Sequence, residues 1–294
     1  MISYEGWILI TGALVGITCG IVGAYLVLRR MAMMADAISH TVLLGIVVAF
    51  LITSRLDGVH MLIGAVIAGL LTTFLVQWFH SKGVQHDASI GVVFTTLFAI
   101  GVILISTSVG NVHLDVKHAW GKLLFIPWNT VSLFGFEIPV ATLILLIVLI
   151  IVLTLILALY KEWKLTAFDP ALALSLGLPV VFLHYLFMGL VSITTVASFD
   201  AVGAIMVVAM LVTPAAAAYL WTERLSVMIG LSASFGAISA IAGYYVALWL
   251  NSSISGAMAM MTGVVFLISF VASPTHGLLA KWIRPPEKKE TGSY

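Results

Sequence analysis

The sequence predicts an all-α polytopic membrane protein, a bundle of about nine transmembrane helices. Of the 294 residues, 62% are hydrophobic and only 9% are charged, whereas soluble domains carry roughly 25% charged residues. Nine apolar runs approach or exceed the length of about 20 residues that crosses a bilayer as a helix. Because lipid offers bare backbone groups no hydrogen-bond partner, we expect all nine to be helical.

The expected spans follow one another along almost the whole chain. They cover residues 7–28, 33–53, 61–79, 90–108, 138–160, 179–198, 201–221, 226–250 and 256–273. The second span begins with polar residues, and the sixth and seventh are nearly continuous around Asp200. We expect one membrane domain over residues 1–284, followed by a short cytoplasmic tail over 285–294.

Lys and Arg in the connections predict an N-terminus outside and a C-terminus in the cytoplasm. This orientation divides the 13 basic residues into ten inside and three outside. The outer three are Arg55, Lys117 and Lys122, and the inner ten are Arg29, Arg30, Lys82, Lys161, Lys164, Arg224, Lys281, Arg284, Lys288 and Lys289.

Charge and cysteine content exclude several classes of protein. The net charge of +1 gives no indication of a nucleic-acid partner. Cys19 is the only cysteine, so one chain has neither a disulfide framework nor a cysteine-rich zinc site. Gly12, Gly16 and Gly20 form a small-residue stripe on the first span. Such a stripe permits close helix packing, either within the bundle or at a dimer seam.

Asp36 and His40 are the strongest indication of function. At a spacing of four residues they project about 40° apart on a helix, roughly 6 Å from one another. Ionisable groups within a span are costly and mark a pathway or a site by default. A carboxylate oxygen and an imidazole nitrogen suit manganese, iron(II) or zinc. The alternative is that Asp36 caps the second helix and His40 hydrogen-bonds within the core.

Other candidate ligands lie nearer the outer side. Asp200 is either a metal ligand or the N-cap of the seventh helix. His113, Asp115 and His118 in the outer loop could collect metal ions, or belong to a solvated loop. His60 and His184 are expected at the outer surface and in the core, respectively. Straight helices would place His40 about 10 Å above the inner boundary and Asp200 near the outer one. A shared site therefore needs broken spans or a different start of the second span.

The inner connection 161–179 predicts a short cytoplasmic helix within residues 166–178. Asp169 before Pro170 is a helix-start signal, and Gly177 followed by Pro179 stops the helix. A short, exposed apolar helix of this kind is either a connector or a docking element for a partner. The chain also lacks a Gly-x-x-x-x-Gly-Lys-Ser/Thr loop, so we expect no ATP hydrolysis by this chain.

Several motifs, in order along nearly the whole chain, resemble the metal-cation ABC permeases, the membrane subunits of bacterial manganese, zinc and iron importers. The first is Arg30-Met-Ala-Met-Met-Ala-Asp-Ala-Ile-Ser-His40, followed by Leu43-Leu-Gly45. The others are Ser89–Phe94, Asn111–Asp115, Phe168–Pro170 with Leu176-Gly177, Val202-Gly203 with Leu211–Ala215, Thr222–Leu225 and Ser273–Leu278. The motif Asp36-Ala-Ile-Ser-His40 is similar to that of the manganese branch of this family.

The resemblance implies a permease that is not itself an enzyme and holds no permanently bound cofactor. The cargo would be a divalent metal, manganese above all, with zinc or iron(II) as alternatives. Asp36 and His40 would bind it transiently, and Asp169, Pro170, Leu176 and Gly177 would transmit closure of cytoplasmic ATPase subunits. The implied assembly in the bacterial cell membrane also contains a second permease subunit and an extracytoplasmic metal-binding protein. His113 and Asp115 would face that metal-binding protein.

The chain departs from the family pattern at two positions. Leu44 stands where the family usually has Pro, and Ala171 replaces the usual acidic residue after Asp-Pro. The second change weakens a salt bridge from the inner helix to its partner, but not docking itself. A secondary metal transporter is the main rival hypothesis, and it would need more ionisable groups within the spans or an inverted repeat.

Overall fold

The computed structural model describes residues 4–53, 58–108, 130–133 and 136–274. Within these ranges the chain is a helical bundle, as predicted. Its long helices are α1 (Tyr4–Leu28), α2 (Ala32–Thr53), α3 (Gly58–Ser81), α4 (His86–Ser108), α6 (Val140–Ala158), α9 (Val180–Val202), α10 (Ala204–Trp221), α11 (Leu225–Leu250) and α12 (Ile254–Ala272). Eight are long and apolar enough to cross a membrane, and α10 holds a shorter apolar stretch. All nine expected spans are confirmed as helices.

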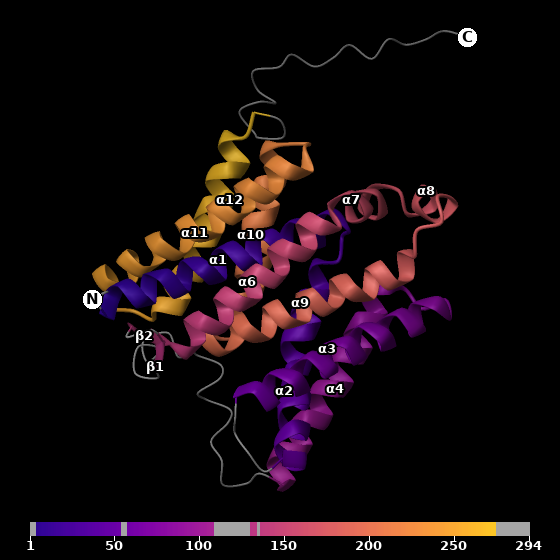
Figure 1. Cartoon of the computed structure of the whole chain (residues 1–294), viewed down its shortest axis with the longest axis horizontal. Helices are drawn as coiled ribbons and strands as arrows, with labels where there is room; N and C mark the ends of the chain where they lie inside the picture. Colours follow the sequence, from indigo (N-terminus) through magenta and orange to yellow (C-terminus); the bar gives the residue numbers. More distant parts are fainter. Residues whose placement is uncertain (1–3, 54–57, 109–129, 134–135, 275–294) are drawn as a thin grey trace.

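Three smaller elements connect the spans. Strands β1 (Thr130–Leu133) and β2 (Phe136–Pro139) pair antiparallel, with Thr130 opposite Pro139. After α6 the chain bends at Leu159 and continues as α7 (Tyr160–Phe168) and α8 (Pro170–Ser175). Figure 1 shows the N-terminal end and the hairpin at the left and α7 and α8 at the right. Helix α1 runs between these two ends. This agrees with the prediction that the N-terminus and the inner connection lie on opposite sides of the membrane.

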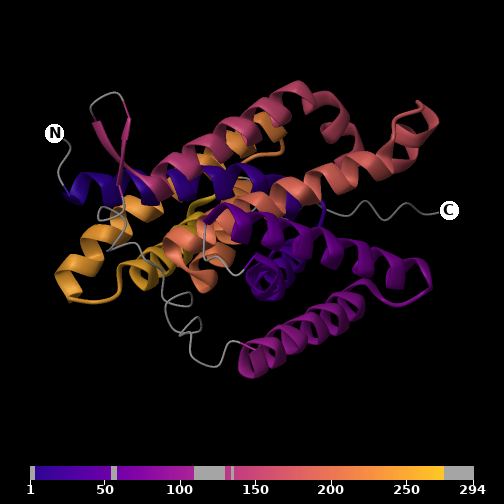
Figure 2. The same ribbon diagram turned by 60° about the horizontal axis from the view of Figure 1, so that its bottom comes forward.

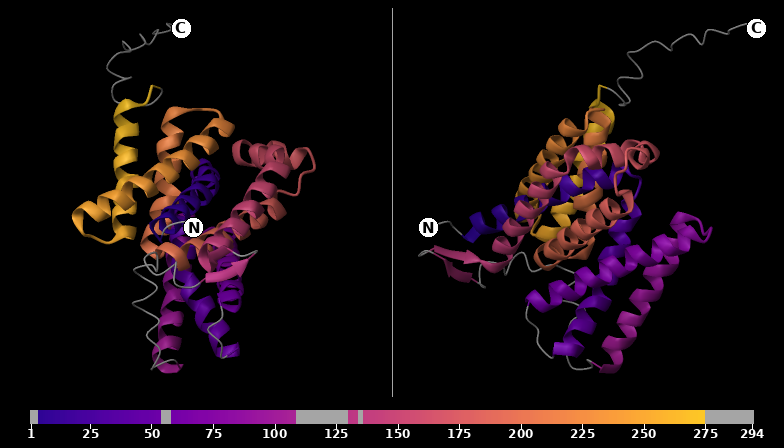
Figure 3. Two further views of the ribbon diagram at one scale, coloured as in Figure 1. Left: turned by 60° about the vertical axis from the view of Figure 1, so that its left-hand side comes forward. Right: turned by 45° about the vertical axis from the view of Figure 1, so that its right-hand side comes forward.

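The helices fall into two groups. Helices α2, α3 and α4, here called the peripheral group, pack mainly on one another, and α3 also packs on α9. Helix α1 is instead surrounded by α6, α9, α10 and α11. Figure 2 shows α4 along the lower outer edge, and Figure 3 shows the peripheral group set apart from the remaining helices.

Close packing of α1 uses the predicted glycine stripe. A Cβ added at Gly16 would collide with the backbone of Gly236 on α11, and one at Gly20 with the backbone of Ser232. The Ser232 hydroxyl donates to the Gly20 carbonyl at 2.7 Å. Gly12, Gly16 and Gly20 are all buried within the chain, so the stripe packs inside the bundle and is not a dimer seam.

Four helix ends close with the same pair of backbone hydrogen bonds, around a residue in the left-handed region. Three of these residues are Gly83, Gly177 and Asn251, with φ of 94°, 79° and 50°, types that tolerate this region. The fourth is Arg30, with φ of 57°. Its amide donates to the carbonyl of Val27, and that of Met31 donates to Leu26. An Arg here costs about 1–2 kcal/mol of backbone energy.

The sixth and seventh expected spans are separated at Gly203 rather than at Asp200. Gly203 has φ of 90° and ψ of 158°, and it is both the C-cap of α9 and the N-cap of α10. Asp200 lies inside the last turn of α9, so its interpretation as the N-cap of the next helix is wrong. Glycine tolerates this φ because it lacks a Cβ.

Candidate functional site

Asp36 and His40 lie together in the first three turns of α2. Atom Nε2 of His40 is 3.6 Å from Oδ1 of Asp36, and the two side chains are 42% and 40% exposed. Because α2 begins at Ala32, Asp36 is not a cap, and because His40 is half exposed, it is not a core histidine. In this structure the pair therefore fits neither the cap nor the core-histidine interpretation.

Two aromatic rings of α4 hold the His40 imidazole. Phe94 stacks on it at 5.8 Å between ring centroids and 30° between planes, and Phe98 meets it edge-on at 5.7 Å. The backbone carbonyl of Asp36 accepts a hydrogen bond of 2.7 Å from the Ser39 hydroxyl. The two rings restrict the orientation of the imidazole, whose Nε2 lies beside the Asp36 carboxylate.

The pair is not completed by other ligands within the described part of the chain. No group of three or more His, Cys, Asp and Glu residues there could hold a metal ion. Residues 113, 115 and 118 of the outer loop lie outside the described residues. Asp200 is on the last turn of α9, whereas the pair is near the start of α2. A further His, Cys, Asp or Glu ligand therefore has to come from outside the described residues or from another chain.

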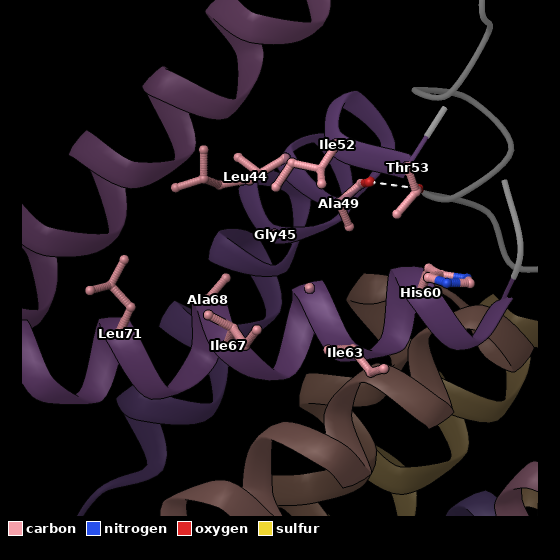
Figure 4. A pocket seen from close by; sticks show the side chains of 12 residues that line it. Leu44, Gly45, Ala49, Ile52, Thr53, His60, Ile63, Ile67, Ala68 and Leu71 are labelled. Carbon is pink, nitrogen blue, oxygen red and sulfur yellow. Dashed lines mark hydrogen bonds between the residues drawn. The ribbon is translucent and has the colours of Figure 1, made fainter. Parts of the chain in front are cut away.

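The turn of α2 that follows His40 leads into an apolar pocket rather than an ion site. This pocket, about 280 Å³, lies between α2 and α3 and is lined by Leu44, Ile63, Ile67 and eight other largely apolar residues, together with His60. Figure 4 shows His60 near Thr53, whose hydroxyl donates to the Ala49 carbonyl at 2.8 Å. A lining of this kind suits acyl chains or other apolar groups, and not a hydrated cation.

The short helix of the inner connection has the expected start and stop, but it is shorter than 166–178. The Asp169 side chain accepts a 2.9 Å hydrogen bond from the Leu172 amide, and Pro170 is the first helical residue of α8. At the other end the amides of Gly177 and Leu178 donate to the carbonyls of Leu174 and Ala173. Residues 166–168 belong to α7, because α7 continues until Asp169 interrupts it.

Helix α8 presents leucines to the exterior. Leu172, Leu174 and Leu176 are all exposed, Leu176 at 64%, and Ala173 is buried. By the predicted orientation this helix is outside the bilayer, where exposed apolar patches mark interaction sites.

Trp163 anchors α7 to the bundle, a feature that sequence reasoning missed. The side chain is fully buried, its ring contacts those of Tyr25 and Phe187, and Nε1 donates to the Leu183 carbonyl at 3.3 Å. In the predicted topology Trp163 falls in the inner connection 161–179, and no role was assigned to it. The position of α7 is thereby fixed to α1 and α9.

Comparison with known proteins agrees with this architecture. Residues 2–273 match the model of the ABC 3 transport family. The chain is 59% identical over 284 residues to the manganese transport system membrane protein MntD of Bacillus subtilis, covering 96% of each chain. It is 39% identical over 277 residues to the zinc transport system membrane protein TroD of Treponema pallidum, covering 93% of this chain and 75% of TroD.

A solved structure shows the same fold. The PsaBC structure from Streptococcus pneumoniae, determined in complex with Fab, superposes with a TM-score of 0.79 at 34% identity, covering 95% of each chain. The helical architecture, the matched family residues and the similarity across almost the full length agree with one another. This multi-pass membrane protein therefore belongs to the ABC 3 transport family.

Proposed function

We propose that this chain is the membrane-spanning permease of an ATP-driven importer of divalent metal ions in a bacterial cell membrane, with manganese as the ion. The observation that carries the proposal is the half-exposed Asp36–His40 pair on a membrane-spanning helix. The name of the 59% identical Bacillus subtilis relative supports manganese. The Treponema pallidum relative, named for zinc, supports zinc as the second candidate.

A second permease subunit completes the site in this proposal. One carboxylate and one imidazole leave most positions of an octahedral ion unfilled. The pair faces the exterior of the chain, beside the peripheral helix α4. A symmetry-related or closely similar chain would present the same two side chains from the other side. Asp200 and the outer-loop residues His113 and Asp115 are proposed as weaker ligands on the outer side, where a metal-binding protein delivers the ion.

Cytoplasmic ATPase subunits drive the cycle in this proposal, by gripping α8. The exposed leucines of α8 provide the apolar contact, and Asp169, Pro170, Leu176 and Gly177 set the shape of the helix. The buried Trp163 connects α7 to α1 and α9. A push on α8 is therefore passed to helices within the membrane rather than absorbed by a loose connection.

Manganese uptake into cells that lack this chain tests the proposal. Wild-type chain should restore uptake when the ATPase partner is active, whereas Asp36→Ala and His40→Ala should each reduce it to the background of empty cells. Asp87→Ala is the matched control, because Asp87 is an exposed carboxylate in the first turn of α4, and it should leave uptake unchanged.

Two results would contradict the proposal. Normal uptake by both Asp36→Ala and His40→Ala, at equal protein levels, would remove the pair from the ion path. Uptake that persists with an ATPase unable to hydrolyse ATP would identify a secondary transporter. Repeating the assay with zinc distinguishes the two candidate ions.

A further inference from the structure

A second pocket lies beside the α1–α2 turn. It has a volume of about 360 Å³ and lies between that turn, the end of α3, α7 and the start of α9. The residues that matter here are Arg29, Arg30, Gln77, Thr166, Val181 and His184. We call this cavity the Arg29 pocket. By the predicted orientation it opens at the cytoplasmic edge of the membrane.

Two arginines give the Arg29 pocket its charge. Arg29 donates from Nη2 to the Thr166 hydroxyl at 2.8 Å, and its guanidinium lies over the Phe187 ring, 5.0 Å from the centroid. Its buried Nε has no hydrogen-bond partner within the described residues. Burial lowers the pKa of Arg29 to about 10, so the side chain stays protonated at pH 7.

Among the residues that the structure describes, neither Arg29 nor Arg30 has a carboxylate within 4 Å. Two guanidinium groups without a carboxylate partner thus line one cavity. Guanidinium is the side chain best suited to bind a phosphate through paired N–H donors.

Arg30 also occupies a backbone position that favours glycine. Gly83, Gly177 and Asn251 fill the corresponding positions at the three other helix ends of this type, whereas Arg30 holds φ of 57°. A strained position points to function when the surrounding structure maintains it. Its side chain is exposed and lines the pocket, so packing does not explain the arginine.

An apolar surface begins directly beside these cations. Val181 and Phe182, in the first turn of α9, are 67% and 62% exposed, and α9 is a membrane-spanning helix. A ligand with an anionic head and an apolar tail would satisfy both surfaces at once. Basic pockets between helices on the cytoplasmic side are suited to anionic lipid headgroups.

From this geometry we infer that the Arg29 pocket binds the phosphate headgroup of an anionic phospholipid from the inner leaflet, with an acyl chain along the exposed start of α9. The headgroup binds beside the Arg29–Thr166 hydrogen bond, which already joins the α1–α2 turn to α7. The inference does not depend on which ion is transported, because lipid binding is measured without transport.

Lipid retention by the full chain, purified with the subunits that accompany it, tests the inference. After exchange into equal amounts of phosphatidylglycerol and phosphatidylcholine, native mass spectrometry should find phosphatidylglycerol retained preferentially. Arg30→Gly should reduce that retention about fivefold, the change expected for one basic residue near a lipid surface. The matched control is Arg224→Gln, since Arg224 is an exposed cation outside the pocket, and it should retain the lipid as the wild type does.

A thermal melt separates lipid binding from damage to the fold. Phosphatidylglycerol should raise the melting temperature of the wild type and of Arg30→Lys, but raise that of Arg30→Gly far less. In phosphatidylcholine alone, Arg30→Gly should melt no lower than the wild type, because glycine relieves the left-handed backbone.

Three outcomes would overturn the lipid assignment. Equal retention of the two lipids by the wild type would show that the pocket does not select an anionic head. An equal stabilisation by inorganic phosphate would assign the pocket to a free anion. Stabilisation by the ATPase subunit that requires Arg30, with none from phosphatidylglycerol, would assign it to protein docking.

Discussion

Two pairs of helices in this protein cross at glycines, but their surroundings differ. Gly16 of α1 meets Gly236 of α11, and Gly45 of α2 meets Gly64 of α3, each so closely that an added Cβ would strike the opposite backbone. Helix α1 is enclosed by its neighbours, whereas α2 belongs to the peripheral group and leaves Asp36 and His40 half exposed. The same packing device thus builds a scaffold in one place and supports a polar pair at an open surface in the other.

The enclosed crossing should be the more sensitive of the two. Gly16→Ala drives a Cβ into the backbone of α11, and the helices around α1 leave little room to relax. We expect a loss of about 3 kcal/mol of stability, the upper part of the usual range for overpacking. The yield of monodisperse protein and its melting temperature measure this loss. Gly230→Ala on α11 is the control, because nothing lies within 4 Å of a Cβ there, and it should not lower either value.

The peripheral crossing should affect function before it affects folding. Gly45→Ala pushes α2 from α3, and because this group lies at the edge of the bundle, the helices can shift to relieve the contact. We expect a cost of about 2 kcal/mol and a fall in manganese uptake larger than the fall in folded protein. Uptake normalised to membrane protein gives the comparison. Equal losses in the two measurements would mean that the displacement of α2 does not reach the pair.

Much of this contrast was available from the sequence. The nine spans were predicted to within a few residues because apolar length is fixed by the bilayer, and the glycine stripe marked the tight face of α1. The Asp36–His40 pair was identified because ionisable residues are rare in spans. These features depend on spacing along one helix, which a single sequence displays directly.

Features that depend on contacts between helices were not predicted. Trp163 lies between Lys161 and Lys164, and nothing in that pattern shows that its ring would be buried against Tyr25 and Phe187. The β1–β2 hairpin and the extension of α6 into α7 were also missed. Phe94 and Phe98 lie within the expected span 90–108. Their four-residue spacing was the one signal that both rings could contact the same side chain, which is His40.

The aromatic support of His40 gives a smaller expected effect. Phe94→Leu keeps an apolar side chain on α4 but removes the stacked ring. Stacking of this kind is worth about 1 kcal/mol, so we expect roughly fivefold weaker manganese binding with unchanged protein yield. Metal titration of the purified protein measures the affinity. Phe266→Leu is the control, because Phe266 stacks with Phe270 on α12, away from the pair.

The smallest expected effect concerns the N-cap of α8, the helix that is proposed to contact the ATPase. Asp169→Ala removes the acceptor for the Leu172 amide and should cost α8 about 0.5 kcal/mol, the low end for an N-cap on an exposed helix. Association with the ATPase subunit should weaken about twofold, as measured by titration in detergent. Asp169→Asn keeps the cap and should bind as the wild type does. If Asp169→Asn weakens binding as much as Asp169→Ala, the ATPase recognises the carboxylate charge and not the shape of α8. That result would separate electrostatic docking from the mechanical role that the buried Trp163 implies.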